Sequence, residues 1–179
     1  MDILDTPLEG LKVLVPRRFE DERGYFLEAY SAQGYASVVG AAFVQDNLSH
    51  SRRGVLRGLH YQYPDWQGKL VYPITGEIFD VAVDIRADSS TFGQWYGLVL
   101  SAREPKQLYI PPGFAHGFCV LSETADVTYK CTAPYNPACE FTLAYNDPSI
   151  GIDWPVATPL LSFKDRQGRS LASILNVSG

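Results

Sequence analysis

The segment between Gly54 and Lys69, GVLRGLHYQYPDWQGK, holds the densest group of chemically capable side chains in this sequence. It places one histidine, His60, close to two cations, Arg57 and Lys69, among aromatic and glycine residues. An imidazole ordinarily titrates near pH 6.5, so it is well suited to accept a proton near neutral pH. His60 is therefore a candidate general base. The alternative is a histidine that only completes the core or the surface.

A general base of this kind needs a carboxylate that orients the imidazole ring. Asp80, Asp84 and Asp165 are candidates, and the residues alone do not choose among them. A tyrosine hydroxyl across a pocket from the histidine would be a competent general acid. Tyr129 and Tyr135 are available for that role, although such tyrosines are most often core or rim aromatics.

Four cations have a possible role in binding or catalysis. Lys69 stands at the start of a predicted strand, where its ammonium group could stabilise an oxyanion as it forms. Arg23, Arg57 and Lys164 could together neutralise a diphosphate, because guanidinium forks suit the geometry of phosphate oxygens. Each of the four is otherwise an ordinary exposed surface charge.

The sequence disfavours a metal centre and the common cofactor sites. A catalytic metal usually needs three protein ligands, and His60 and His116 would require Glu77 or an aspartate as the third. No P-loop, no GxGxxG after a strand, no GxSxG elbow and no catalytic cysteine motif is present. Among enzymes, a cofactor-free acid–base reaction beside a carbonyl group remains, and we expect no metal and no cofactor.

The composition indicates a globular protein with one domain. The chain has 179 residues, of which 46% are hydrophobic and 13% aromatic, so disorder is not expected. The net charge of −5 argues against a protein that coats nucleic acid. No apolar segment resembles a signal peptide or reaches the roughly 18 residues of a membrane span. The three cysteines form no CxxC pair, and we expect a cytoplasmic protein with reduced thiols.

Short elements follow one another along the chain. Ser31 is placed to cap a helix over residues 32–39, which Gly40 ends. Residues 41–51 are predicted as a strand followed by a polar loop, and residues 165–177 as a region with one short helix.

Many short strands, separated by turn residues every 8–12 positions, predict an all-β sandwich or barrel. Its inward side chains would line a pocket. In the predicted strand around His60, Arg57 and His60 would face opposite ways, and a bulge at Gly58 would bring them together. Tyr129 alternates with buried-type neighbours and is expected to point inward.

Long ordered blocks of this sequence resemble one known family. They are QDNLSHSRRGVLRGLHYQ, QGKLV, GEIFDVAVDIR, STFGQW, QLYIPPGFAHGF, YKCTAPYNP, NDPSIGIDWP and LSFKD. They resemble the dTDP-4-dehydrorhamnose 3,5-epimerases over roughly residues 10–166. The resemblance implies a cupin-type jelly roll without a metal, and a homodimer whose N-terminal arm, about residues 1–30, reaches the neighbouring subunit. PPGFAHGF resembles the second cupin motif, whereas the metal pattern of the first is missing.

The resemblance also implies a substrate and roles for particular residues. The substrate would be a dTDP-sugar, dTDP-4-dehydro-6-deoxy-D-glucose, inverted at C3 and C5 through an enolate. His60 matches the base, Asp165 its partner, Tyr129 the acid and Lys69 the residue that steadies the enolate oxygen. The residues matched to nucleotide-sugar contacts are Arg23, Glu28, Gln45, Asn47, Arg57, Lys69, His116, Tyr135, Glu140 and Lys164.

Three other functions remain open at this point. A relative that inverts only C3 or only C5 would use the same His60, Asp165 and Tyr129. A non-catalytic cupin that binds a sugar nucleotide would be expected to lack one of these residues, and all three are present. A metal-dependent cupin dioxygenase would need ligands that the sequence does not supply.

Overall fold

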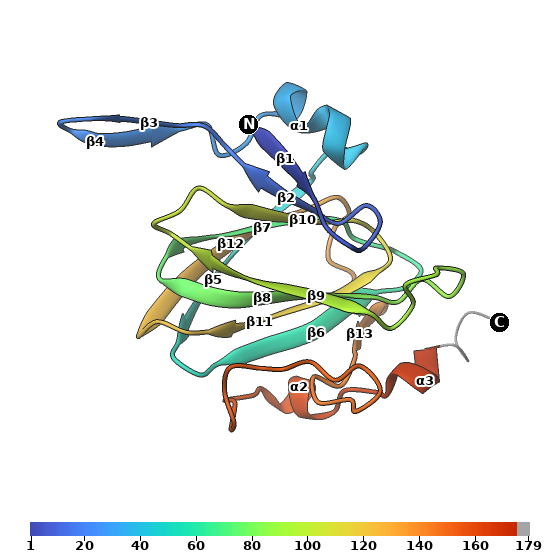
Figure 1. Ribbon diagram of the computed structural model, residues 1–179. Helices are drawn as coiled ribbons and strands as arrows, with labels where there is room; N and C mark the ends of the chain where they lie inside the picture. Colours follow the sequence, from blue (N-terminus) through green and yellow to red (C-terminus); the bar gives the residue numbers. More distant parts are fainter. Residues whose placement is uncertain (175–179) are drawn as a thin grey trace.

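The computed structural model describes residues 1–174, and most of its strands form two large sheets that pack face to face (Figure 1). The first sheet contains, in spatial order, β1 (Asp2–Asp5), β2 (Lys12–Val15), β10 (Gln107–Ile110), β7 (Lys69–Thr75), β12 (Thr124–Cys131) and β5 (Gln45–Arg52). The second contains β13 (Glu140–Thr142), β6 (Leu56–Gln62), β11 (Phe114–Val120), β8 (Glu77–Asp84) and β9 (Trp95–Ser101). The predicted all-β sandwich with a few short helices is confirmed.

The main core lies between the two sheets. Alternate residues of each strand point inward, since side chains on a strand alternate between its two faces. Buried residues from both sheets meet there: Val71, Leu108 and Val127 from the first sheet, and Ile78, Ala82 and Phe118 from the second. This core fixes the spacing of the sheets and therefore the width of any pocket between them.

Strand β8 is buried on both faces. Its alternation places Ile78 and Ala82 in the core between the sheets, while Val81 and Val83 pack on the opposite side. The chain after β13 covers that opposite side, where it contributes Leu171 and other apolar residues (Figure 1). The C-terminal segment is thus held against the outer face of the second sheet, close to β6.

The N-terminal part of the chain adds a hairpin and a helix. Strands β3 (Arg18–Asp21) and β4 (Gly24–Leu27) pair with each other and project from the body (Figure 1). Helix α1 (Ala32–Val39) begins after Ser31, whose hydroxyl accepts a hydrogen bond from Gly34 N, and ends at Gly40 with a left-handed φ of 65°. Both predicted caps are confirmed.

Two predictions about local structure need correction. Residues 45–52, partly predicted as a polar loop, form one continuous strand that pairs with β12 along its whole length. Its inward residues are polar, so the hydrophobic signal of a strand is missing. In the C-terminal region, α3 (Leu171–Ile174) is the short helix predicted within residues 165–177, whereas α2 (Phe163–Arg166) begins before that range and was not predicted. Residues 175–177 of the prediction lie outside the described residues.

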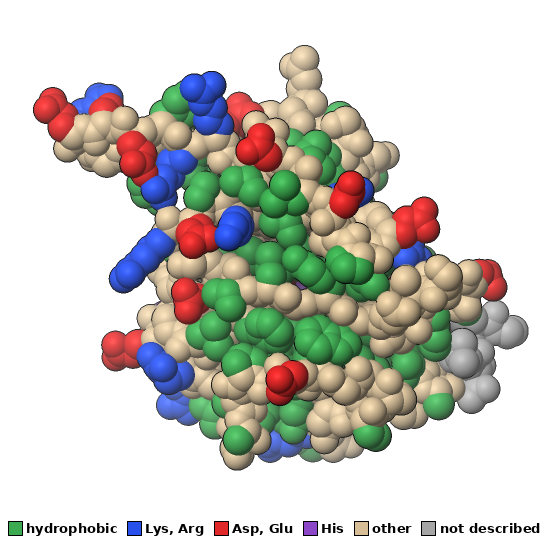
Figure 2. All heavy atoms as spheres, in the orientation of Figure 1, with side chains coloured by type: hydrophobic (Ala, Val, Ile, Leu, Met, Phe, Trp, Pro, Cys, Tyr) green, Lys and Arg blue, Asp and Glu red, His purple; other side chains and the backbone are tan. Residues whose placement is uncertain are grey.

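The molecular surface mixes charge and apolar area. In the view of Figure 2, charged side chains lie mainly on the projecting hairpin and around the periphery, and hydrophobic side chains gather over the middle of the face. None of the helices in residues 1–174 has the length and apolar character needed to cross a membrane.

Candidate active site

The arrangement of the site begins with a bulge in β6. His60 pairs with His116 and Arg57 with Phe118, so β6 has one more residue than β11 between these two pairs. Gly58 makes this possible, because it has φ 122° and lies so close to the neighbouring strand that a Cβ would stand 2.6 Å from Gly117 Cα. The bulge turns Arg57 and His60 into the same pocket, as predicted.

The structure selects Asp165 from the three candidate carboxylates. Asp165 lies on α2, and its Oδ1 is 2.6 Å from His60 Nε2 although the two residues are 105 positions apart. Asp80 instead lies 2.8 Å from His116 Nε2, and Asp84 binds the guanidinium of Arg86. The His60–Asp165 pair has the geometry of a base with its orienting carboxylate.

Burial and hydrogen bonding set the protonation of this pair. Burial lowers the pKa of His60 below its ordinary value, which outweighs the opposite effect of the hydrogen bond with Asp165. Burial alone would raise the pKa of Asp165, but hydrogen bonds from His60, Ser162 and the Gly58 amide hold that pKa below its ordinary range. An ionised carboxylate only accepts, so Nε2 of His60 carries the proton and Nδ1 remains free to accept one.

The pair borders a pocket of about 320 Å³ between the two sheets. Both sheets supply its lining residues: Gln45, Asn47, Ser49, Arg57, His60, Tyr61, Gln62, Gln67, Lys69, His116, Phe118, Tyr129, Cys131, Tyr135, Glu140 and Lys164. Asp165 lies behind His60 and is 4% exposed. The pocket is thus lined by most of the side chains that the sequence singled out.

Tyr129 and Lys69 complete the reactive groups. Tyr129 reaches the pocket from β12, in the sheet opposite to the one that carries His60, and burial raises its pKa. Lys69 is 7% exposed, its Nζ donates to the backbone oxygen of His60 at 3.3 Å, and burial lowers its pKa. The pocket therefore presents a neutral imidazole on one sheet, and the phenol of Tyr129 and the side chain of Lys69 on the other.

A chain of polar contacts runs around one side of the pocket. Gln45 accepts a hydrogen bond from the Tyr135 amide at 2.7 Å and donates to Asn47 at 2.9 Å. The Tyr135 hydroxyl donates to Glu140 at 2.9 Å, and Lys164 donates to the other oxygen of Glu140 at 2.6 Å. Because the exposed Tyr135 is tethered at its amide and its hydroxyl, it forms a defined wall.

A second set of contacts holds Arg57 and His116. Arg57 donates from Nε to the Ser51 hydroxyl at 3.0 Å and from a terminal nitrogen to the backbone oxygen of His50. His116 is 6% exposed and is oriented by the buried Asp80. Both side chains are thus fixed on the pocket wall.

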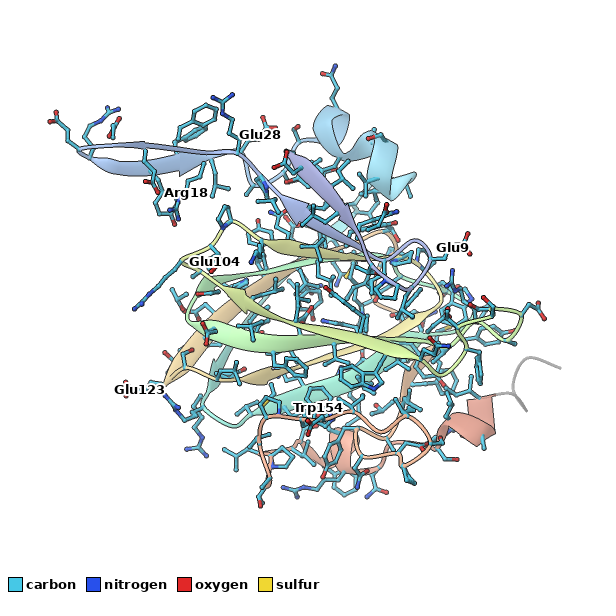
Figure 3. All side chains as sticks on the ribbon, viewed as in Figure 1. Glu9, Arg18, Glu28, Glu104, Glu123 and Trp154 are labelled. Carbon is cyan, nitrogen blue, oxygen red and sulfur yellow. The ribbon has the colours of Figure 1, made fainter. Side chains whose placement is uncertain are left out.

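Two predicted contacts lie outside the pocket. Arg23 is on the projecting hairpin and pairs with Asp21, with a nitrogen–oxygen distance of 2.5 Å. Glu28 lies between the hairpin and α1, where it accepts a hydrogen bond from Ser31 at 2.8 Å (Figure 3). Within this single chain, neither residue reaches the group around His60.

Several contributors to the site were not foreseen. Ser162 donates a hydrogen bond to Asp165 Oδ2 at 2.7 Å, and Asp80 orients His116 rather than His60. Gln62 lies two residues after His60 and bonds the backbone of the loop that carries Tyr135. The spacing of Ser162 and Asp165, which is that of a helix cap, was the available signal for the first.

The structure brings no group of three or more histidine, cysteine, aspartate or glutamate side chains together in metal-binding geometry, within the part of the chain that it describes. His60 and His116 each turn Nε2 toward an aspartate.

Comparison with known proteins identifies the relatives of this chain. The family model described as dTDP-4-dehydrorhamnose 3,5-epimerase matches residues 5–173. The chain belongs to this family. It is 54% identical over 174 residues to the dTDP-4-dehydrorhamnose 3,5-epimerase of Neisseria gonorrhoeae. The aligned residues cover 96% of this chain but only 53% of that relative. The chain thus spans about half the length of that protein.

Two further relatives are similar over nearly their full length. The dTDP-4-dehydrorhamnose 3,5-epimerase of Shigella flexneri is 50% identical over 172 residues, which cover 94% of this chain and 95% of the relative. The crystal structure of a dTDP-6-deoxy-D-glucose-3,5-epimerase from Legionella pneumophila Philadelphia 1, in complex with dTDP-4-keto-L-rhamnose, superposes with a TM-score of 0.93 at 49% identity. The alignment covers 97% of this chain and 96% of that one. The predicted family is confirmed.

Proposed function

We propose that this protein is an epimerase that inverts C3 and C5 of dTDP-4-dehydro-6-deoxy-D-glucose and yields dTDP-4-dehydro-L-rhamnose. The observation that carries this proposal is the His60–Asp165 pair, which faces a pocket shared with Tyr129 and Lys69. Membership of the family, and the product-like ligand in the Legionella structure, support the assignment of the substrate.

The first step is proton removal by His60. The C4 ketone acidifies the hydrogens at C3 and C5, so a neutral imidazole can take one of them while the C–H electron pair moves toward the C4 oxygen. Asp165 keeps Nε2 protonated and stabilises the imidazolium that forms. A positioned base of this kind contributes roughly 10²–10⁴-fold to the rate.

Lys69 is proposed to stabilise the enolate. Its amine lies next to the backbone of His60, so it can meet negative charge that develops beside the base. One preorganised donor to an oxyanion is worth roughly 3–4 kcal/mol. This interaction strengthens as the enolate forms, and it therefore lowers the barrier rather than only binding the ketone.

Tyr129 is proposed to return a proton on the opposite face of the sugar. It belongs to the sheet that faces His60, so the two groups approach a bound ring from opposite sides. After the transfer, His60 holds the abstracted proton and Tyr129 lacks one, and exchange with solvent restores both. The side chains present can therefore balance both proton transfers without a cofactor.

The remaining polar residues are proposed to bind the nucleotide and the sugar. They are Gln45, Asn47, Arg57, His116, Tyr135, Glu140 and Lys164, all of which line the pocket. Arg23 and Glu28 would act in the pocket of a second copy, reached by the N-terminal arm of residues 1–30. The protein would then be a single-domain homodimer. We propose a cytoplasmic location, which the three free cysteines support.

The proposal is tested by proton NMR of dTDP-4-dehydro-6-deoxyglucose with the protein in D₂O. We expect deuterium at both C3 and C5, and an L-rhamno product when a reductase traps it. Deuterium at one carbon only would identify a single-centre epimerase. Binding without exchange at either carbon would contradict the enzymatic function.

A further inference from the structure

The hydroxyl group of Ser162 makes two hydrogen bonds with the same residue. Ser162 precedes α2, and its oxygen accepts from the Asp165 amide at 3.1 Å while its hydrogen is donated to Asp165 Oδ2 at 2.7 Å. In an ordinary capping box, the acidic residue three positions on returns to the backbone N–H of the cap residue. Here the carboxylate is turned away, toward His60.

Three donors together define the orientation of this carboxylate. Oδ1 accepts from His60 Nε2 at 2.6 Å and from the Gly58 amide at 3.3 Å. Oδ2 accepts from Ser162, the donor found for that oxygen among the described residues. Rotation of the carboxylate about its bond to Cβ would break the hydrogen bonds at both oxygens. Ser162 holds Oδ2, the oxygen that is not bonded to His60.

The short helix cannot provide that restraint by itself. Helix α2 has four residues, too few to be stable without contacts to the rest of the fold. The Gly58 amide is on β6, and it ties Oδ1 to the strand that carries the base. The Ser162 hydroxyl ties Oδ2 to the start of the helix, so the carboxylate is held from both sides.

We propose that Ser162 is a positioning residue whose hydroxyl holds Asp165, and through it the imidazole of His60, in the orientation that proton abstraction needs. This inference rests on the epimerase function proposed above. Ser162 does not line the pocket, so it would affect the proton-transfer step and not substrate binding.

Three substitutions separate positioning from capping. Ser162→Thr keeps both the acceptor and the donor, Ser162→Gly keeps most of the helix-capping stability without a hydroxyl, and Ser162→Ala loses both. We expect kcat to fall about tenfold in the Gly and Ala variants, as for the loss of one hydrogen bond to a charged group, with KM within about twofold. The Thr variant should keep kcat near that of the wild type.

The pH dependence gives a second readout that a purely structural role would not move. With one donor fewer, Asp165 becomes more basic and favours the imidazolium form of His60, so the acid limb of kcat/KM should move to higher pH in Ser162→Gly. Ser173→Ala, which removes a hydroxyl from α3 in the same segment, is the control and should leave kcat and this limb unchanged.

Wild-type kcat in Ser162→Gly together with a slow Ser162→Ala would show that only capping matters, and would overturn the proposal. An unmoved acid limb in Ser162→Gly would also contradict it. These outcomes are distinct from failure of the proposed function, in which the wild-type protein itself would not exchange deuterium into the substrate.

Discussion

Two histidine–aspartate pairs lie side by side in this protein and differ in their surroundings. His60 on β6 and His116 on β11 are direct partners in the sheet, and each has Nε2 within 2.8 Å of an aspartate oxygen. The side chain of His60 is 26% exposed, whereas that of His116 is 7% exposed. Both histidines line the pocket, but the imidazole of His60 is the more exposed of the two and that of His116 is mostly enclosed.

The two carboxylates differ even more than the two imidazoles. Asp165 accepts additional hydrogen bonds from Ser162 and from a backbone amide. Asp80 is fully buried, and its Oδ2 has no hydrogen-bond partner in residues 1–174. A carboxylate supported at both oxygens can stay ionised while its histidine gains and loses a proton. Asp80 is suited instead to holding His116 in one place.

The largest expected effect separates the two histidines. His60→Ala should lower kcat by roughly 10²–10⁴-fold because the base is lost, with the fold intact. His116→Ala should mainly raise KM, because His116 is proposed only to bind. Steady-state kinetics with a coupled reductase measure both, and thermal unfolding controls for folding. Equal losses of kcat in the two variants would contradict the different roles proposed for His60 and His116.

Neutralising the carboxylates should reduce kcat no more than loss of the base does, and again unequally in the two pairs. In Asp165→Asn, an amide that donates to Nε2 would force the proton onto Nδ1 and remove the basic nitrogen. We expect kcat to fall by up to about 10⁴-fold, the loss expected when a catalytic histidine is held in the wrong tautomer. The matched variant Asp80→Asn makes the same substitution in the other pair, with nearly the same side-chain volume.

For Asp80→Asn we expect KM to rise about tenfold, with kcat within about threefold, because His116 would lose the hydrogen bond that orients it. Measuring kcat and KM separately distinguishes the two pairs. A large loss of kcat with unchanged KM would show that the buried pair also transfers protons.

The smallest expected effect is in the pH profile. Because burial lowers the pKa of His60, kcat/KM should stay near its maximum as the pH falls to about 6.5, the ordinary imidazole pKa, and decline only below it. On the alkaline side, the lowered pKa of Lys69 should begin to reduce kcat/KM below the ordinary pKa of lysine, about 10.4. An acid limb centred above 6.5 would contradict the assignment of His60.

The stability of the folded protein should also decrease as the pH falls. The pKa values of His60 and Asp165 are both lowered in the folded state, so the unfolded chain binds more protons between each ordinary value and the lowered one. The free energy of unfolding therefore rises as the pH rises through these ranges. The stability that the two groups contribute is lost as the pH falls through the same ranges. Denaturant titrations of the wild type and of Asp165→Asn between pH 3 and 8, values chosen to span both ordinary pKa ranges, would measure this slope.

Much of the fold and part of the site could be predicted because the relevant signals are local. The cap residues Ser31 and Gly40 define α1 by their own chemistry. Gly58 indicates a bulge because glycine tolerates the close approach of a neighbouring strand, and that bulge joins Arg57 and His60 in the pocket.

Long-range pairing could not be predicted from the residues by themselves. Nothing local distinguishes Asp165 from Asp80 as the partner of His60, and only the resemblance to a family pointed to the correct one. The positions of Arg23 and Glu28 depend on a second copy, so their predicted role is open within one chain. Strand β5 was partly missed because its inward face is polar, and a strand that lines a pocket lacks the hydrophobic pattern.

That polar strand has a consequence for motion. Strand β5 is at the edge of the first sheet and pairs with β12 alone among the strands of residues 1–174. Its inward Gln45, Asn47 and Ser49 line the pocket rather than an apolar core. An edge strand with few buried apolar contacts opens at lower free energy than the strands beside it. Its amides should exchange with solvent early, and a bound nucleotide sugar should slow that exchange more here than in β7 or β8.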